Sequence, residues 1–210
     1  MDINDYILAH SDDEGTLLAA LNRDANVNLL RPRMLSGHLQ GRILKMFCRM
    51  LRPKRVLEIG TYTAYATLCM AEGMDEGSLI HTIEINDENE EIKQKNHTQT
   101  PHKEKKRLQN GEAKQKKPTK NETNDLVFID ANKRLYSAYY DLVFPMVRPG
   151  GLILADNTLW DGKVTEEHIP SADKQTLGIL AFNDKIKSDE RVEKVILPLR
   201  DGLTMILKKE

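Results

Sequence analysis

This chain of 210 residues has almost no net charge, few long apolar runs and only two cysteines. Its formal net charge of -1 gives no general reason to expect a nucleic acid or a membrane surface as a partner. No apolar run approaches the roughly 18 residues that suggest a membrane span. Residues 1–15 are acidic and lack the basic and apolar regions of a secretory signal. We therefore expect neither a membrane nor a nucleic-acid partner.

Two cysteines are present, Cys48 and Cys69, and they have neither CxxC spacing nor metal-ligand spacing. Reduced, packed thiols explain them better than a disulfide or a metal site does. Because thiols stay reduced in the cytosol, we expect a cytoplasmic protein.

The chain reads as a single domain over residues 1–210, because no long flexible linker interrupts it. Apolar residues at helical spacing predict N-terminal helices within residues 1–52, one of them beginning after the acidic residues 12–14. Residues 53–210 alternate between strand-like and helix-like patterns, which predicts an α/β core with helices on both faces of a parallel sheet. The predicted strands are 55–59, 78–85, 126–129 and 151–155, and the predicted helices are 65–71, 135–146 and 174–187.

The last two apolar stretches, 192–199 and 203–207, flank the sequence Arg200-Asp201-Gly202. Asp-Gly between two apolar strands marks a β-hairpin. A parallel sheet that ends in an antiparallel hairpin strand differs from the usual dinucleotide dehydrogenase.

Residues 90–124 interrupt the alternation. Nine lysines crowd this segment, and its only apolar residues are Ile92, Leu108 and Ala113. Neither the stripe of a packed helix nor the alternation of a buried strand is visible, so we predict a weakly folded segment or one held by its neighbours. A basic run can also bind nucleic acid, but no aromatic residue is interleaved for base stacking.

Two predicted strands end in a carboxylate, and a glycine turn follows the first of them. Glu58 precedes Gly60, and Glu84 lies near the end of the next strand. At the carboxyl edge of a parallel sheet, such a turn approaches a nucleoside while the second acid accepts both ribose hydroxyls. The glycines that a pyrophosphate needs are absent, so a nucleoside without phosphates fits better than NAD. A steric glycine turn and an exposed Glu84 are the structural alternatives.

Oxygen side chains end two further predicted strands, namely Asp130 and the pair Asp156-Asn157. They should emerge at the same edge as Glu58 and Glu84. Three converging oxygen ligands suit a hard divalent cation, Mg²⁺ first, with Mn²⁺ and Ca²⁺ as alternatives. Without histidine or thiolate ligands zinc is disfavoured, and a turn or helix cap at Asp156-Asn157 remains the structural alternative.

Six blocks of sequence, from about residue 34 to the end, together carry a family resemblance. They are residues 34–42, 56–63 and 128–133, the tyrosines 136, 139 and 140, and residues 148–151 and 156–164. The last block, Asp-Asn-Thr-Leu-Trp-Asp-Gly-Lys-Val, is the most specific. The chain resembles the cation-dependent O-methyltransferases of the caffeoyl-CoA and catechol type, which use S-adenosylmethionine. This implies the class I methyltransferase fold, a three-layer α/β sandwich whose mostly parallel seven-stranded sheet ends in an antiparallel strand, and commonly a homodimer.

The resemblance also implies roles for individual residues. Asp130, Asp156 and Asn157 match the metal ligands, and Lys133, beside Asp130, matches the general base of the catechol enzymes. Trp160 would stand beside a small phenolic acceptor, although a packing role explains it nearly as well. The positions that match cofactor-binding residues are Ser36, Glu58, Gly60, Thr61, Ala66, Glu84, Ala113 and Asp130. In such a site the metal-bound phenol ionises more readily, and the methyl group passes in line from sulfonium to oxygen.

Three residues depart from the family pattern. Ala64 replaces a glycine, Ala66 replaces a hydroxyl that would meet the cofactor's carboxylate, and Asn132 replaces a common Asp. A left-handed alanine costs about 1–2 kcal/mol, and the lost charge-assisted hydrogen bond is worth about 1.5–3 kcal/mol. A second hypothesis is therefore a protein of this fold that binds cofactor poorly and no longer turns over. A third, a nicotinamide oxidoreductase, is disfavoured by the missing glycines and the hairpin.

Overall fold

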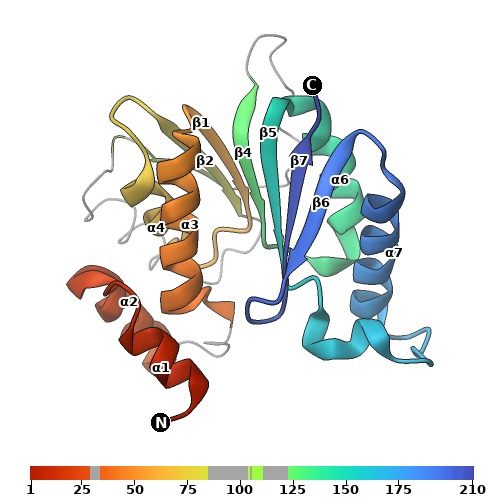
Figure 1. Cartoon of the computed structure of the whole chain (residues 1–210), viewed down its shortest axis with the longest axis horizontal. Coiled ribbons are helices and arrows are strands. Elements are labelled where there is room, and N and C mark those ends of the chain that lie inside the picture. The colour runs from red at the N-terminus through yellow and green to blue at the C-terminus, as the bar shows by residue number, and fades with distance from the viewer. Residues whose placement is uncertain (29–33, 85–103, 105, 111–122) are drawn as a thin grey trace.

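A seven-stranded sheet forms the centre of the computed structural model, which describes residues 1–28, 34–84, 104, 106–110 and 123–210 (Figure 1). The strands are β1 Arg55–Ile59, β2 Leu79–Glu84, β3 Lys106–Asn110, β4 Asn124–Ile129, β5 Val147–Asp156, β6 Val192–Leu197 and β7 Leu203–Lys208. The α-helices are α1 Ile3–Ala9, α2 Gly15–Asn28, α3 Gly37–Leu51, α4 Tyr65–Gly73, α6 Tyr136–Val143 and α7 Lys174–Ser188. Short 3₁₀ turns are η4 Lys133–Leu135, η5 Phe144–Met146 and η6 Trp160–Thr165.

The strand order is β3-β2-β1-β4-β5-β7-β6. Strands β1 to β5 pair in parallel, whereas β7 runs antiparallel to both β5 and β6. The predicted α/β class, the parallel core and the C-terminal hairpin at Asp201-Gly202 are therefore confirmed.

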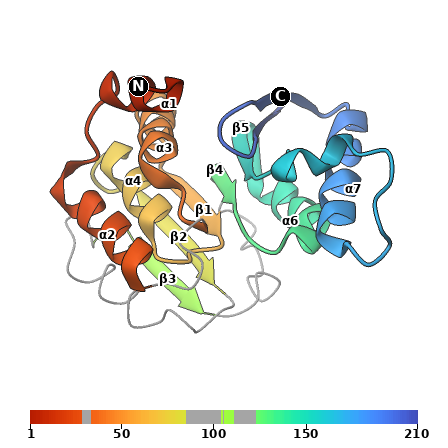
Figure 2. The same ribbon diagram turned by 90° about the horizontal axis from the view of Figure 1, so that it is seen from below.

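Apolar side chains on the two faces of the sheet form two cores. In β4, Leu126 and Phe128 belong to the core beneath α2, α3 and α4, whereas Val127 and Ile129 belong to the core beneath α6 and α7. The two helix groups lie on opposite sides of the strands in Figure 2. Because both faces are covered, the central strands read as continuous apolar runs, which is why the sequence revealed them.

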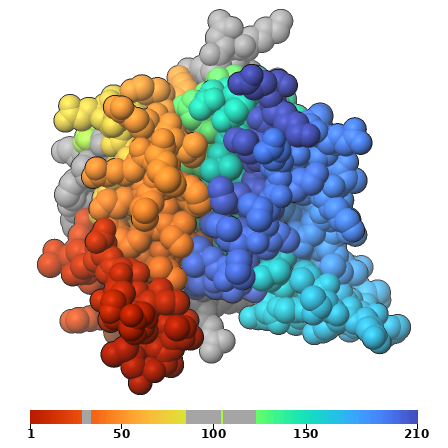
Figure 3. Space-filling model, in the orientation of Figure 1, coloured from red at the N-terminus to blue at the C-terminus, as the bar shows by residue number. Residues whose placement is uncertain are grey.

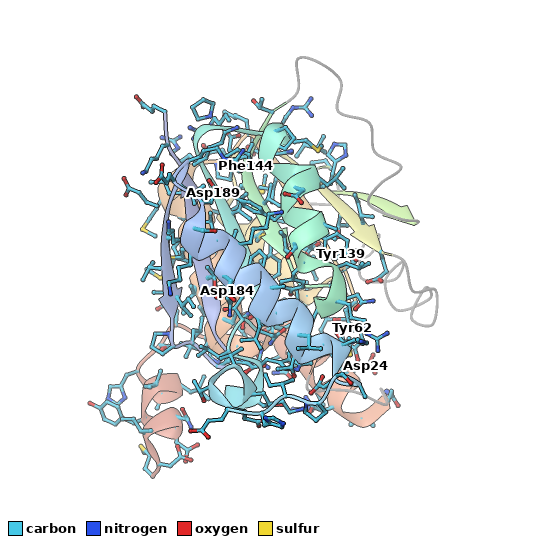
Figure 4. All side chains as sticks on the ribbon, turned by 90° about the vertical axis from the view of Figure 1, so that its right-hand side faces the viewer. Asp24, Tyr62, Tyr139, Phe144, Asp184 and Asp189 are labelled. Atoms are coloured by element: carbon cyan, nitrogen blue, oxygen red, sulfur yellow. The ribbon has the colours of Figure 1, made fainter. Side chains whose placement is uncertain are left out.

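Helices α6 and α7 pack side by side over one face, with Phe144 and Asp189 at the same end (Figure 4). There, the Tyr140 hydroxyl donates to Asp189 Oδ2 at 2.9 Å, and the Arg191 guanidinium lies 4.0 Å from the centre of the Phe144 ring. These contacts tie the start of β6 to α6. Within the described part of the chain, no helix combines the length and apolar character needed to cross a membrane.

Strand β3 lies in the segment 90–124, where the sequence shows no apolar alternation. It pairs in parallel with β2 at the edge of the sheet. Backbone pairing with a neighbour needs no apolar alternation, so residues 106–110 fit the prediction of a segment held by its neighbours. Residues 85–103, 105 and 111–122 lie outside the described residues.

Candidate active site

The carboxyl ends of four parallel strands lie level with one another. Ile59 on β1 is paired with Ile83 on β2 and with Ile129 on β4. Ile129 is in turn paired with Ala155 on β5. The residues that follow these four are Gly60, Glu84, Asp130 and Asp156. The register therefore brings the predicted cofactor turn and the predicted metal ligands to one edge of the sheet.

Gly60 lets the chain leave β1 directly beside the end of β4. Its φ is +99°, and a Cβ at this position would lie 1.9 Å from the carbonyl oxygen of Asp130. The Gly60 amide donates to Ile83 O, and the Asp130 amide donates to Ile59 O, both at 2.9 Å. Only glycine permits this close approach, because a side chain would collide with backbone.

Glu84 closes the turn from the β2 side. Its Oε2 accepts hydrogen bonds from the amides of Thr61 at 3.0 Å and Tyr62 at 2.7 Å. Tyr62, labelled in Figure 4, has a left-handed φ of +48°, which helps both amides face the same carboxylate. The predicted ribose acid thus also shapes the loop on which the cofactor would lie.

Glu58 is completely buried beneath this loop. Its Oε2 accepts a 2.5 Å hydrogen bond from the Thr67 hydroxyl on α4, and its Oε1 has no hydrogen-bond partner among the described residues. Burial raises the pKa of Glu58 to about 8, although the Thr67 hydroxyl opposes the shift. A buried carboxyl with an open oxygen at the cofactor edge is suited to a ligand that carries positive charge.

The start of α4 carries the two alanines that depart from the family pattern. Ala64 has φ +67° and ψ +15°, so it occupies the left-handed region that favours glycine. It is buried and caps α4 without a side-chain hydrogen bond. Ala66 lies in the first turn of α4, also buried, and offers no hydroxyl. The condition under which we expected strain is therefore met.

Lys133 is surrounded by oxygen atoms of the predicted metal ligands. Its ammonium donates to Asp130 Oδ1 at 2.9 Å and to Asn157 Oδ1 at 2.7 Å. It also lies 3.5 Å from the carbonyl oxygen of Asp156. The side chain is buried, so these oxygens replace the water that would otherwise solvate the ammonium. The structure therefore brings Lys133, Asp130, Asp156 and Asn157 together.

The hydroxyl of Tyr136 completes the shell of Lys133, from which it accepts a hydrogen bond at 2.6 Å. It lies 2.9 Å from the carbonyl oxygen of Asp156. Full burial raises the pKa of Tyr136 well above its usual value, and the nearby charge of Asp130 adds to this effect. The phenol is therefore neutral and acts as a hydrogen-bonding support.

Asp156 is held by two further donors. Gln40 Nε2 on α3 donates to its Oδ2 at 2.7 Å, and the Asn157 amide donates to its Oδ1 at 2.8 Å. Burial and the negative charge of Asp130 raise the pKa of Asp156 above the usual value, in opposition to the charge of Lys133. Gln40 is wholly buried, and sequence reasoning missed its role because the contact spans 116 positions.

Arg200, in the β6–β7 turn, connects the C-terminal hairpin with the start of α3. Its guanidinium donates to the carbonyl oxygens of Leu35, at 2.8 Å, and Ser36, and it lies 3.5 Å from Gln40 Oε1. Ser36, a predicted cofactor residue, is buried at this junction. The hairpin therefore fixes the segment that supplies both Ser36 and Gln40.

Three other predicted residues have simpler surroundings. Trp160 is partly buried and packs against the core beneath α6 and α7, which fits the packing alternative, while its contact with an acceptor stays a prediction. Asn132 Oδ1 accepts from the Arg134 amide at 3.2 Å and so begins the turn η4. Ala113 lies outside the described residues.

The donor set suits a hard cation. Two carboxylates and one amide oxygen are the ligand types that Mg²⁺ and Mn²⁺ prefer. A positive charge, the Lys133 ammonium, already binds two of these side chains. Among the described residues, no group of three His, Cys, Asp or Glu side chains could hold a metal, so an ion here would depend on Asn157 as the third ligand.

Comparison with known proteins identifies the family of this chain. The family model described as O-methyltransferase matches residues 8–209. A probable caffeoyl-CoA O-methyltransferase 1 from Dictyostelium discoideum is 32% identical over 98% of this chain and 91% of its own length. A catechol O-methyltransferase from Niastella koreensis is 29% identical over 97% of this chain and 93% of its own length.

Solved structures give the same result for the fold. An O-methyltransferase from Bacillus cereus, solved in complex with SAH, superposes with a TM-score of 0.86 at 26% identity and covers 99% of this chain and 97% of its own. The O-methyltransferase TomG from Streptomyces achromogenes, solved with SAM, has a TM-score of 0.89 at 22% identity. The match covers 99% of this chain and 96% of TomG. The chain therefore belongs to the O-methyltransferase family of the caffeoyl-CoA and catechol type and has its class I, Rossmann-like fold.

Proposed function

We propose that this protein transfers a methyl group from S-adenosylmethionine to a hydroxyl of a small catechol-like or phenolic acceptor, with the help of a divalent cation. The observation that carries the proposal is that side-chain oxygens of Asp130 and Asn157, together with the backbone carbonyl oxygen of Asp156, surround the Lys133 ammonium beside the Gly60 turn. The relative from Bacillus cereus, solved with SAH, supports the choice of cofactor.

The cofactor would lie along the turn after β1. Glu84 faces this turn from β2 and would accept the ribose hydroxyls. Glu58 would place its buried carboxyl group opposite the positively charged end of the cofactor, with Gly60 and Thr61 as the backbone beneath it. Ser36 and Ala66 border the same region, so positioning is the main contribution of this part of the site.

Asp130, Asp156 and Asn157 would hold the cation, with Mg²⁺ as the first choice and Mn²⁺ or Ca²⁺ as alternatives. When bound, such an ion stabilises a phenolate by Coulomb attraction and lowers the pKa of the acceptor hydroxyl. Lys133 would accept the phenolic proton. Gln40 and Tyr136 keep Asp156 and Lys133 in place through their hydrogen bonds. Trp160 would border the acceptor.

Titration calorimetry tests the cofactor part of this proposal. We expect S-adenosylmethionine to bind with micromolar affinity, and binding to persist in Thr16→Ala, which alters an exposed position on α2. The absence of any binding heat would support the alternative of an inactive protein of the same fold. Binding of NADH in its place would refute both hypotheses.

We also propose a homodimer, because α1 exposes apolar side chains to solvent. No residue of α1 is buried, and Ile3 and Tyr6 are 70% and 51% exposed. The helix lies at the corner of the molecule, shown red in Figure 3. A second copy of the chain would bury this apolar surface. Light scattering should give a dimer mass for the unaltered chain and a monomer mass for Ile7→Glu, and a monomer in both would refute the proposal.

A cytoplasmic location also remains a proposal. Cys48 and Cys69 are both free thiols in the core, and free buried thiols are typical of a reducing compartment.

A further inference from the structure

The Lys133 ammonium forms contacts with four oxygen atoms of its own chain. They belong to Asp130, Tyr136 and Asn157 and to the backbone of Asp156, at 2.6 to 3.5 Å. An ammonium group has three protons, so these acceptors occupy its whole donor capacity. In this arrangement Lys133 serves as the cation of the cluster and is not aimed at an acceptor molecule.

Two of these oxygens are also the atoms that a metal would need. Asp130 Oδ1 and Asn157 Oδ1 each lie within 3 Å of the ammonium nitrogen. A divalent ion would approach the same oxygens to about 2.0–2.6 Å. An ammonium and a divalent ion at such short range repel each other, and the buried position of Lys133 weakens solvent screening.

We infer that Lys133 is an internal competitor of the divalent cation, so that the cation binds with full affinity only when the ammonium leaves Asp130 and Asn157. The inference rests on the proposed function, because it takes the predicted metal ligands as ligands. In the metal-free protein the positive charge of Lys133 offsets the negative charge of Asp130, and its hydrogen bonds link Asp130 with Asn157. Metal affinity is thus lowered by a residue of the site itself.

Manganese binding, followed through the loss of the free Mn²⁺ signal in electron paramagnetic resonance, tests this directly. The variant Lys133→Met removes the charge and keeps a side chain of similar length. We expect it to bind Mn²⁺ about tenfold more tightly, or better, than the unaltered chain. The matched control is Lys185→Met, since Lys185 pairs with Asp141 on the surface between α7 and α6. It should bind Mn²⁺ as the unaltered chain does.

The outcomes separate this inference from the proposed function. If the unaltered chain binds Mn²⁺ and Lys133→Met binds it equally or more weakly, competition is wrong while the metal site stands. If neither protein binds Mn²⁺, the removal of the ammonium opens no site, and both the inference and the metal part of the proposed function fail.

Because Lys133 is buried, its variant needs an independent check. Near-ultraviolet circular dichroism should show that Lys133→Met keeps its tertiary packing. A crystal structure of the unaltered chain soaked with Mn²⁺ gives a second readout that needs no variant. We expect the Lys133 nitrogen to move out of hydrogen-bond distance of Asp130 and Asn157. Manganese bound to both oxygens with the ammonium still in place would overturn the inference.

Discussion

The buried carboxyl of Glu58 makes stability depend on pH in a defined direction. Its pKa is about 8 in the folded chain because burial disfavours the charged form, whereas the ordinary value is 4.5. The folded state therefore holds a proton that the unfolded state releases between these two values. The stabilising effect is fully present below pH 4.5 and is lost as the pH rises through about 8.

The variant Glu58→Gln removes this titration and keeps the shape of the side chain. Relative to the variant, the unaltered chain should lose unfolding free energy as the pH rises, by at most about 1.4 kcal/mol per pH unit. Over the window from pH 5 to 8 the difference should reach a few kcal/mol.

Urea unfolding at pH 5, 6, 7 and 8 measures this difference. The difference between the two proteins isolates Glu58, because the other titrating groups are common to both. Glu76→Gln, at an exposed position in the turn before β2, serves as the control and should follow the unaltered chain at every pH. Parallel profiles for the unaltered chain and Glu58→Gln would refute the reasoning about burial.

Three further changes test other parts of the site. Gly60→Ala should abolish binding of S-adenosylmethionine in calorimetry, because its Cβ would lie 1.9 Å from Asp130 O, and retained affinity would contradict this. Ala64→Gly relieves about 1–2 kcal/mol of left-handed backbone strain. It also adds unfolded-state entropy that costs about 0.4–1 kcal/mol. The urea midpoint of the variant should therefore rise slightly, and a fall would contradict the assignment of strain to Ala64. Gln40→Leu should lower the unfolding free energy by about 1.5–3 kcal/mol, because Asp156 loses a donor, and an unchanged value would show that the bond contributes nothing.

The sequence predicted those features that depend on local pattern and on the geometry of parallel strands. Apolar runs located β1, β2, β4 and β5, and the shared edge of parallel strands then brought Asp130 and Asp156 together with Gly60. The same reasoning placed the hairpin, because Asp-Gly turns have a strong local signature. Each of these inferences uses only neighbours in the chain or the sheet.

The sequence did not predict features that depend on partners far away in the chain. Strand β3 is held by backbone pairing with β2, for which its side chains carry no apolar signal. Gln40 and Arg200 act through contacts between the ends of the chain, and their residue types are common on exposed surfaces. The sequence placed Lys133 near the ligands but could not show that its ammonium would lie among them.

The most direct measurement is methyl transfer from radiolabelled S-adenosylmethionine to catechol, with Mg²⁺ present and with Mg²⁺ removed by a chelator. We predict product with Mg²⁺, loss of product with the chelator, and recovery when Mg²⁺ is added back in excess. Transfer that continues undiminished without any divalent cation would contradict the role given to Asp130, Asp156 and Asn157.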